Sequence, residues 1–114
     1  MARHSPAPIL GEFEQMVMLA LLRLGADAYG AAVCAEIEQR GRRGVSVSAV
    51  HTTLDRLEQK GLVKSRIGDP TPQRGGKRKR HYEIAPLGMR SLQASYRSLR
   101  SMADGLEHLL GEPA

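Results

Sequence analysis

The 114-residue sequence has little cysteine and few aromatic side chains: a single cysteine, Cys34, one phenylalanine and no tryptophan. A lone cysteine can form neither a disulfide framework nor a zinc finger, which excludes both classes of small stapled domain. No apolar run reaches the roughly eighteen residues of a membrane span, and the N-terminal MARHSPAPIL lacks the apolar stretch of a signal peptide. We therefore expect one domain in the cytoplasm, with no part in a membrane.

Sequence motifs for catalysis and for cofactor or metal binding are also missing. The chain has no GxSxG, no Walker loop and no GxGxxG. Its four histidines, together with one cysteine, show no metal-ligand spacing; they are His4, His51, His81 and His108. We expect no enzyme activity, no cofactor and no bound metal.

Positive charge is concentrated in the middle of the chain. Residues 40–80 hold twelve of the seventeen Lys and Arg residues but only three of the twelve acidic ones, so the flanking segments are net acidic. Such a concentration indicates a surface for a polyanion. A run of charges alone is as often an ordinary solvated face.

Apolar periodicity predicts three helices in the first half. Residues 1–10, which contain two prolines, predict a flexible arm. A helical stripe runs from Phe13 to Leu24, and Leu19 and Leu22 make a second side apolar, as expected for a helix also covered by another subunit. Further helices are predicted over 29–40 and 49–60, the latter after the β-rich triplet 45–47.

Two residues in this half carry local predictions. Ser48 is the expected N-cap of the third helix. Cys34 falls on the core side of the second helix, which favours a small buried residue over a redox sensor.

The second half predicts a hairpin and a long helix. Residues 62–67 and 80–85 are strand candidates, separated by a segment rich in Gly, Pro and positive charge. Beyond Pro86, apolar residues recur every 3.5 positions as far as Leu110, which predicts a helix over 86–111 that packs along another helix. Gly88 and Gly105 are expected to weaken it.

This order of elements, mainly α with a small β-hairpin, is that of a winged helix-turn-helix over 11–85 with a C-terminal dimerisation helix over 86–111. The side of the third helix opposite its apolar stripe carries small hydroxyl groups near its N-terminus, which suits close approach to a DNA backbone. The expected DNA contacts are Tyr29, Ser48, His51, Thr52 and Arg56, together with the hairpin-tip residues Arg74, Lys77, Arg78 and Lys79. For Tyr29, packing at the start of the second helix is the first expectation and phosphate contact the second.

Four stretches carry a family resemblance: GEFEQMVMLALLRLG, AYGAAV, VSVSAVHTTLDRLEQKGLVKSR and RGGKRKRHYEIAPLG. Through them, residues 11–92 resemble the PadR family of bacterial transcriptional regulators, especially its short members with a single C-terminal helix. The resemblance implies a dimeric, repressor-like protein whose C-terminal helix packs against the partner's N-terminal helix. His51 stands where the family usually has Tyr, and Ala85 where it usually has Thr, so the last helix is expected to lack a side-chain cap.

The sequence thus predicts a homodimeric repressor that binds a two-fold double-stranded DNA operator at the bacterial nucleoid. The expected dimer interface consists of Phe13, Met16, Leu92, Tyr96, Leu99, Leu106 and Leu110. Two alternatives stay open: a winged-helix module that binds protein, and a sensor gated by a small apolar effector. The effector cavity would be lined by Phe13, Met16, Met89 and Tyr96, although plain interface packing is the favoured interpretation of these four.

Overall fold

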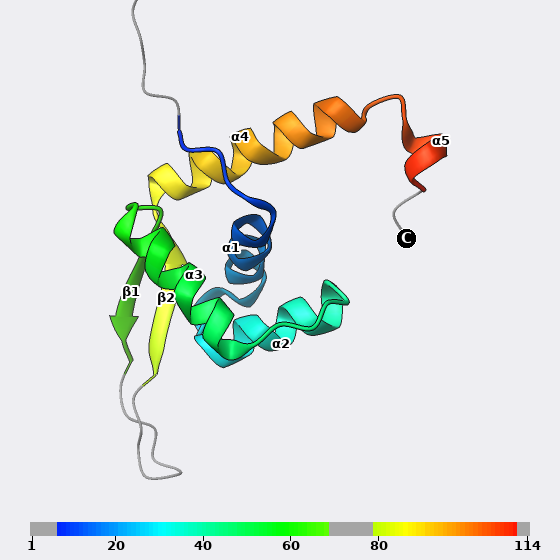
Figure 1. Cartoon of the computed structure of the whole chain (residues 1–114). Coiled ribbons are helices and arrows are strands. Elements are labelled where there is room, and N and C mark those ends of the chain that lie inside the picture. Colours follow the sequence, from blue (N-terminus) through cyan, green and yellow to red (C-terminus); the bar gives the residue numbers. More distant parts are fainter. Residues whose placement is uncertain (1–6, 69–78, 112–114) are drawn as a thin grey trace, which may run out of the picture.

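The structure is a computed structural model that describes residues 7–68 and 79–111. In chain order its elements are α1 (Glu12–Leu24), the short 3₁₀ turn η1 (Gly25–Asp27), α2 (Gly30–Arg40), α3 (Val47–Gln59), β1 (Val63–Ile67), β2 (Arg80–Ile84), α4 (Pro86–Ala103) and α5 (Glu107–Leu110). Helix α1 lies in the centre, with α2, α3 and the hairpin around it and α4 crossing above (Figure 1). The predicted mainly helical fold with a small hairpin is confirmed.

The core is built where the apolar stripes of the first three helices meet. Val17 and Met18 of α1 are fully buried against Val50, Leu54 and Leu57 of α3.

The predicted burial of Cys34 is confirmed, and its thiol donates to the Val45 carbonyl oxygen at 3.4 Å. Burial, followed by the negative charge of Glu38, raises the pKa of the Cys34 thiol, which lowers its thiolate fraction.

Helix α3 begins two residues earlier than predicted. Ser46, not Ser48, is the N-cap: its side chain accepts a hydrogen bond from the Ala49 backbone N–H at 3.0 Å, and the helix begins at Val47. The two β-branched valines of the triplet 45–47 suggested extended backbone, but only Val45 packs against the core. Ser48 therefore lies inside the first turn of α3 with an exposed side chain that is not used for capping.

The two strands pair in antiparallel fashion, from Val63 opposite Ile84 to Ile67 opposite Arg80. The preceding connection adds a short third piece to this sheet. Tyr29 forms a bridge with His81, and the Tyr82 N–H donates to the Ala28 carbonyl oxygen at 2.9 Å. The first residues of β2 are thereby held against the start of α2.

Helix α4 begins at an unusually close contact. A Cβ at Gly88 would overlap the carbonyl oxygen of Leu62, so only glycine allows α4 to lie this near β1. The Ala85 N–H donates to the same carbonyl at 3.0 Å. Ala85 is the N-cap and offers no side-chain cap, as predicted. Gly88 thus serves the packing of the helix rather than weakening it.

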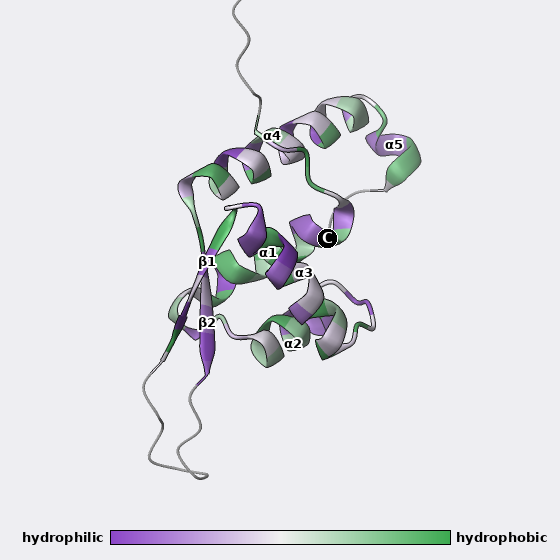
Figure 2. Ribbon diagram, turned by 60° about the vertical axis from the view of Figure 1, so that its left-hand side comes forward, coloured by the Kyte–Doolittle hydropathy of each residue, from purple (hydrophilic) through white to green (hydrophobic). Residues whose placement is uncertain are grey.

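The predicted single helix over 86–111 is interrupted. Helix α4 ends at Ala103, and Gly105 has a φ of +85°, a backbone conformation that glycine adopts readily and that an α-helix cannot contain. The apolar spacing continues through Leu106 and Leu110, but on the separate four-residue helix α5. In Figure 2, hydrophobic colour extends to α5, at the end of the arm that α4 and α5 form.

The end of the predicted flexible arm belongs to the folded domain. Leu10 is buried in the core, and its backbone N–H donates to Ser95 Oγ of α4 at 3.0 Å.

The carboxylate of Glu14 accepts hydrogen bonds from the Gly11 N–H at 2.9 Å and from the Lys60 ammonium at 3.0 Å. Burial alone would raise the pKa of Glu14, but these two hydrogen bonds and the positive charges of Lys60 and Arg56 lower it overall.

Candidate nucleic-acid interface

Helix α3 presents one polar face to solvent. Val50, Thr53, Leu54 and Leu57 point into the core, so the opposite side of the helix is exposed. That exposed side carries all four of the α3 residues predicted to contact DNA: Ser48, His51, Thr52 and Arg56. Hydroxyl groups and a helix N-terminus at one end of this face can donate hydrogen bonds to phosphate oxygens.

The start of β2 places a cation beside α2. Lys79 Nζ lies 4.1 Å from the centre of the Tyr29 ring, within cation–π distance. The His81 ring packs edge-on against Tyr29, with 5.9 Å between ring centres, and its Nδ1 lies 3.0 Å from the Ala26 carbonyl oxygen. Tyr29 is half-buried by these contacts, so packing is its structural role here.

His81 is a positioning residue that sequence reasoning missed. The sequence identifies His81 only as a histidine with no metal-ligand partner at suitable spacing. In the structure it joins β2 to both η1 and Tyr29, and so fixes where the hairpin leaves the domain. The alternation of the strand RHYEI, which places His81 and Glu83 on the side opposite Tyr82, was the available signal.

One hollow brings the two predicted DNA-binding elements together. It is lined by the start of α2, by His51 of α3 and by Lys79 and Arg80 of the hairpin. Helix α2 begins here without a side-chain cap, so its first N–H groups and positive dipole end have no capping oxygen. A Cβ at Gly30 would lie 2.6 Å from the His51 ring, which shows how closely α3 approaches α2. The arrangement suits an anion such as a phosphate group.

Part of the basic run pairs with carboxylates of the same chain. Arg40 pairs with Glu36 on the same helix. Arg43 donates to Glu12 at 2.8 Å and stacks on Phe13, so it ties the loop before α3 to α1. Lys60 pairs with the buried Glu14. Arg56, Lys79 and Arg80 are exposed and form no salt bridge within residues 7–68 and 79–111, and Arg74, Lys77 and Arg78 lie outside these residues.

A comparison with models of protein families identifies the family of the chain. The model of the transcriptional regulator PadR-like family matches residues 18–94, well over half of the chain. This chain belongs to the PadR-like family. The family match confirms the predicted role as a transcriptional regulator. No curated protein sequence matches the chain significantly.

Solved PadR-family structures share the winged-helix fold of the chain. A regulator from Clostridium difficile R20291 is 22% identical, with a TM-score of 0.71, and the match covers 89% of this chain and 100% of that one. A regulator from Eggerthella lenta DSM 2243 is 26% identical, with a TM-score of 0.65 and coverage of 90% and 88%. Bacillus subtilis PadR, solved with operator DNA, is 20% identical, with a TM-score of 0.58 and coverage of 73% and 47%.

The residues predicted at a dimer interface of this PadR-like chain fall into three groups. Tyr96 and Leu99 of α4 are exposed, as are Leu106 and Leu110 at α5. Phe13 and Met16 are half-buried and pack against the core of their own chain. Leu92 is only 4% exposed because it is part of that core.

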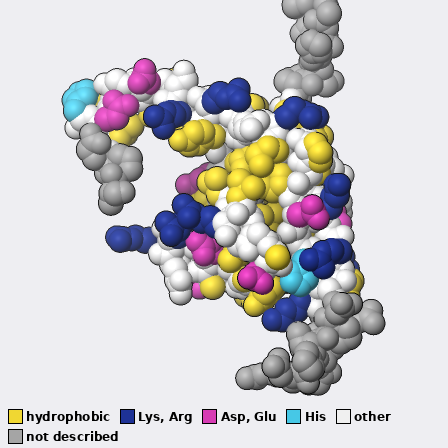
Figure 3. All heavy atoms as spheres, turned by 180° about the vertical axis from the view of Figure 1, so that it is seen from behind, with side chains coloured by type: hydrophobic (Ala, Val, Ile, Leu, Met, Phe, Trp, Pro, Cys, Tyr) yellow, Lys and Arg dark blue, Asp and Glu magenta, His cyan; other side chains and the backbone are white. Residues whose placement is uncertain are grey.

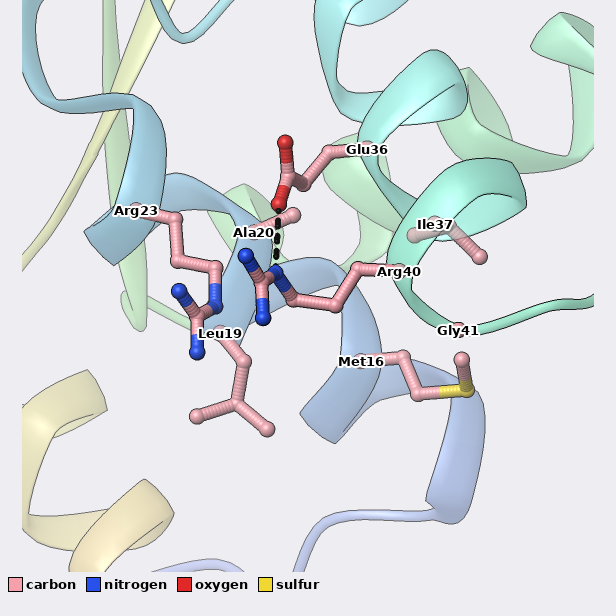
Figure 4. Close-up of a pocket in the computed structure, with 8 residues that line it drawn as sticks. All are labelled: Met16, Leu19, Ala20, Arg23, Glu36, Ile37, Arg40 and Gly41. Atoms are coloured by element: carbon pink, nitrogen blue, oxygen red, sulfur yellow. Dashed lines mark hydrogen bonds and ion pairs between the residues drawn. The ribbon is translucent and has the colours of Figure 1, made fainter. Parts of the chain in front are cut away.

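A groove between α1 and α2 was not anticipated. Met16, Leu19, Ala20 and Ile37 form its apolar part, with Arg23, Glu36 and Arg40 at the rim and Gly41 closing one end (Figure 4). Its volume is about 220 Å³. Of the four residues predicted to line an effector cavity, Phe13, Met16, Met89 and Tyr96, only Met16 lines this groove.

The described residues hold neither a metal cluster nor a helix able to span a bilayer. Within residues 7–68 and 79–111, no three His, Cys, Asp or Glu side chains are placed to hold a metal ion together. None of the helices in that part of the chain has the length and apolarity needed to cross a bilayer.

Proposed function

We propose that this PadR-like regulator binds operator DNA as a homodimer in the bacterial cytoplasm and represses transcription by occupying the site. The observation that carries the proposal is the shared hollow, where His51 of α3 meets Lys79 and Arg80 of the hairpin at the N-terminus of α2. Two elements that would contact DNA separately are thereby presented on one surface.

Each part of this surface has a distinct task. In the proposal, α3 enters the major groove, where Thr52 and Arg56 reach base edges and Ser48 contacts a phosphate. The wing, formed by β1, β2 and the segment between them, tracks the flanking backbone with Lys79, Arg80 and the tip cations predicted from the sequence, Arg74, Lys77 and Arg78. A phosphate in the hollow would receive charge from three elements at once.

The exposed apolar side chains of the arm support the homodimer. Leu99 is 64% and Met102 76% exposed on α4, and Leu19 and Leu22 are exposed on α1. A surface with this much apolar area is typical of a protein interface. A second copy related by two-fold symmetry would cover it and would place the two α3 helices about 34 Å apart, one turn of the duplex.

The proposal is tested by Leu99→Asp, with DNA that the purified wild-type protein selects from a random pool. Leu99 contacts solvent in its own chain, so the substitution leaves the monomer folded, and a charge at the centre of the interface opposes association. We expect monomers by sedimentation and at least a tenfold loss of affinity for the selected site. An exposed control on β2, Glu83→Gln, remains dimeric.

Two outcomes contradict the proposal. A Leu99→Asp protein that remains fully dimeric shows that α4 does not form the interface. A monomeric variant that binds the selected DNA as tightly as wild type shows that a homodimer is not the binding species.

A further inference from the structure

The polar face of α3 carries a carboxylate as well as hydroxyl and basic groups. Asp55 has an exposed side chain and lies four residues after His51 and three after Thr52, so these side chains are neighbours on the helix surface. It is not one of the predicted DNA contacts. A negative charge at this place is unexpected, because the proposed ligand of the face is a polyanion and like charges repel.

Asp55 takes part in no ion pair within the part of the chain that the structure describes. The ion pairs there use the carboxylates of Glu12, Glu14 and Glu36. Figure 3, a view from behind, shows Asp and Glu side chains next to Lys and Arg side chains on that face. Burial raises the pKa of the Tyr82 hydroxyl, and the negative charge of Asp55 raises it further, so Asp55 lies within electrostatic range of the wing.

Asp55 stands between the shared hollow and the middle of the polar face. At about 3.6 residues per turn, it projects from α3 between His51, which lines the hollow, and Thr52, which lies opposite the buried stripe. If a phosphate occupies the hollow, the base edges of the groove lie toward the middle of the face. Asp55 is therefore placed to meet a base rather than the backbone.

The hydrogen-bonding chemistry of a carboxylate limits which base it can recognise. An ionised aspartate only accepts hydrogen bonds. In the major groove, base pairs offer two donors, the N4 amine of cytosine and the N6 amine of adenine. The adenine amine lies next to N7, an acceptor that repels a carboxylate, whereas cytosine itself presents no acceptor in this groove. Cytosine is therefore the base that suits Asp55.

We propose that Asp55 is a specificity-determining residue that accepts a hydrogen bond from the N4 amine of one cytosine in each half of the operator. This proposal rests on the proposed function and names one base that α3 recognises. Thr52 and Arg56 can donate hydrogen bonds to guanine or thymine, and Asp55 complements them as an acceptor. On DNA without that cytosine, the same carboxylate opposes binding.

Selection from a random pool of duplexes tests the assignment. The amide of Asp55→Asn both donates and accepts, a pattern that matches N7 and the N6 amine of adenine. We expect the sequence that this variant selects to change at one position in each half, from cytosine to adenine, and to keep its other positions. Asp104→Asn is the matched control: it removes the same charge at the end of α4, where the side chain is also exposed, and should select the wild-type sequence.

Fluorescence anisotropy measures the size of the effect. Replacing that C·G pair by T·A in both halves puts the O4 acceptor of thymine where the amine stood, and should weaken wild-type binding roughly tenfold or more. Asp55→Ala should bind the two duplexes within about threefold of one another, because no side chain then discriminates between them. On a scrambled duplex this variant should bind several-fold more tightly than wild type, since the dimer loses two negative charges.

The outcomes separate this inference from the proposed function. If wild type selects a defined sequence and Asp55→Asn selects the same one, Asp55 recognises no base, and the DNA-binding function stands. If Asp55→Ala gains affinity equally on the C·G and T·A duplexes and keeps the wild-type preference, the carboxylate is a repulsive charge without a role in specificity. If wild type selects no sequence and binds no duplex, the proposed function fails together with the inference.

Discussion

A variant with Lys77→Ala, Arg78→Ala and Lys79→Ala is expected to bind DNA roughly a hundredfold more weakly, or worse, at moderate salt. The proposed dimer loses six cations, and each one that contacts a phosphate also makes the logarithmic salt slope about one unit shallower. Lys79 is the described member of the three, and it lies over the Tyr29 ring at the hollow where α3 meets the wing. Fluorescence anisotropy with the selected DNA and with a scrambled duplex measures the effect.

The loss should be similar on both duplexes, because phosphate contacts carry no base information. The matched control keeps the charge at the same positions, as Lys77→Arg, Arg78→Lys and Lys79→Arg, and should bind within about threefold of wild type. If the alanine variant binds DNA normally, the wing is not the electrostatic part of the interface. That result would favour the alternative of a winged helix that binds protein.

Gly88→Ala is expected to destabilise the fold by about 3 kcal/mol or more. The added methyl group would overlap the Leu62 carbonyl oxygen, which is backbone and cannot rotate away. Leu62 is fully buried and already accepts the Ala85 N–H, so α4 can move off only by breaking that hydrogen bond. In thermal unfolding the midpoint should fall by roughly 10–20 °C.

Gly44→Ala is the control for this prediction. A Cβ at Gly44 meets no atom within 4 Å, and its φ lies outside the positive region, so the change should stay within about 0.5 kcal/mol of wild type. Equal stabilities of the two variants would mean that α4 does not pack on Leu62 as closely as described.

The parts of the fold that follow from local pattern could be predicted from the sequence. The stripe from Phe13 to Leu24 specifies α1, and Gly25 ends it, because periodic burial and a glycine stop are both local signals. The exposed face of α3 follows from the same periodicity, which is why Ser48, His51, Thr52 and Arg56 are all found on it.

The parts that depend on contacts far apart in the sequence could not be predicted. Leu10 is buried in the core, and its N–H donates to Ser95, 85 residues away. Leu92 belongs to the core because α4 crosses over α1, and a 3.5-residue spacing does not distinguish packing on the own chain from packing on a partner. His81 is recognisable as a positioning residue only when Ala26 and Tyr29 are seen beside it.

The most direct test of the central claim is the salt dependence of DNA binding by the wild-type protein. If a dimer neutralises roughly 6 to 10 phosphates, affinity for the selected duplex should fall about a thousandfold or more between 50 and 200 mM salt. A flat salt dependence over this range would contradict the account, because the cations at α3 and the wing would then have no phosphate partners.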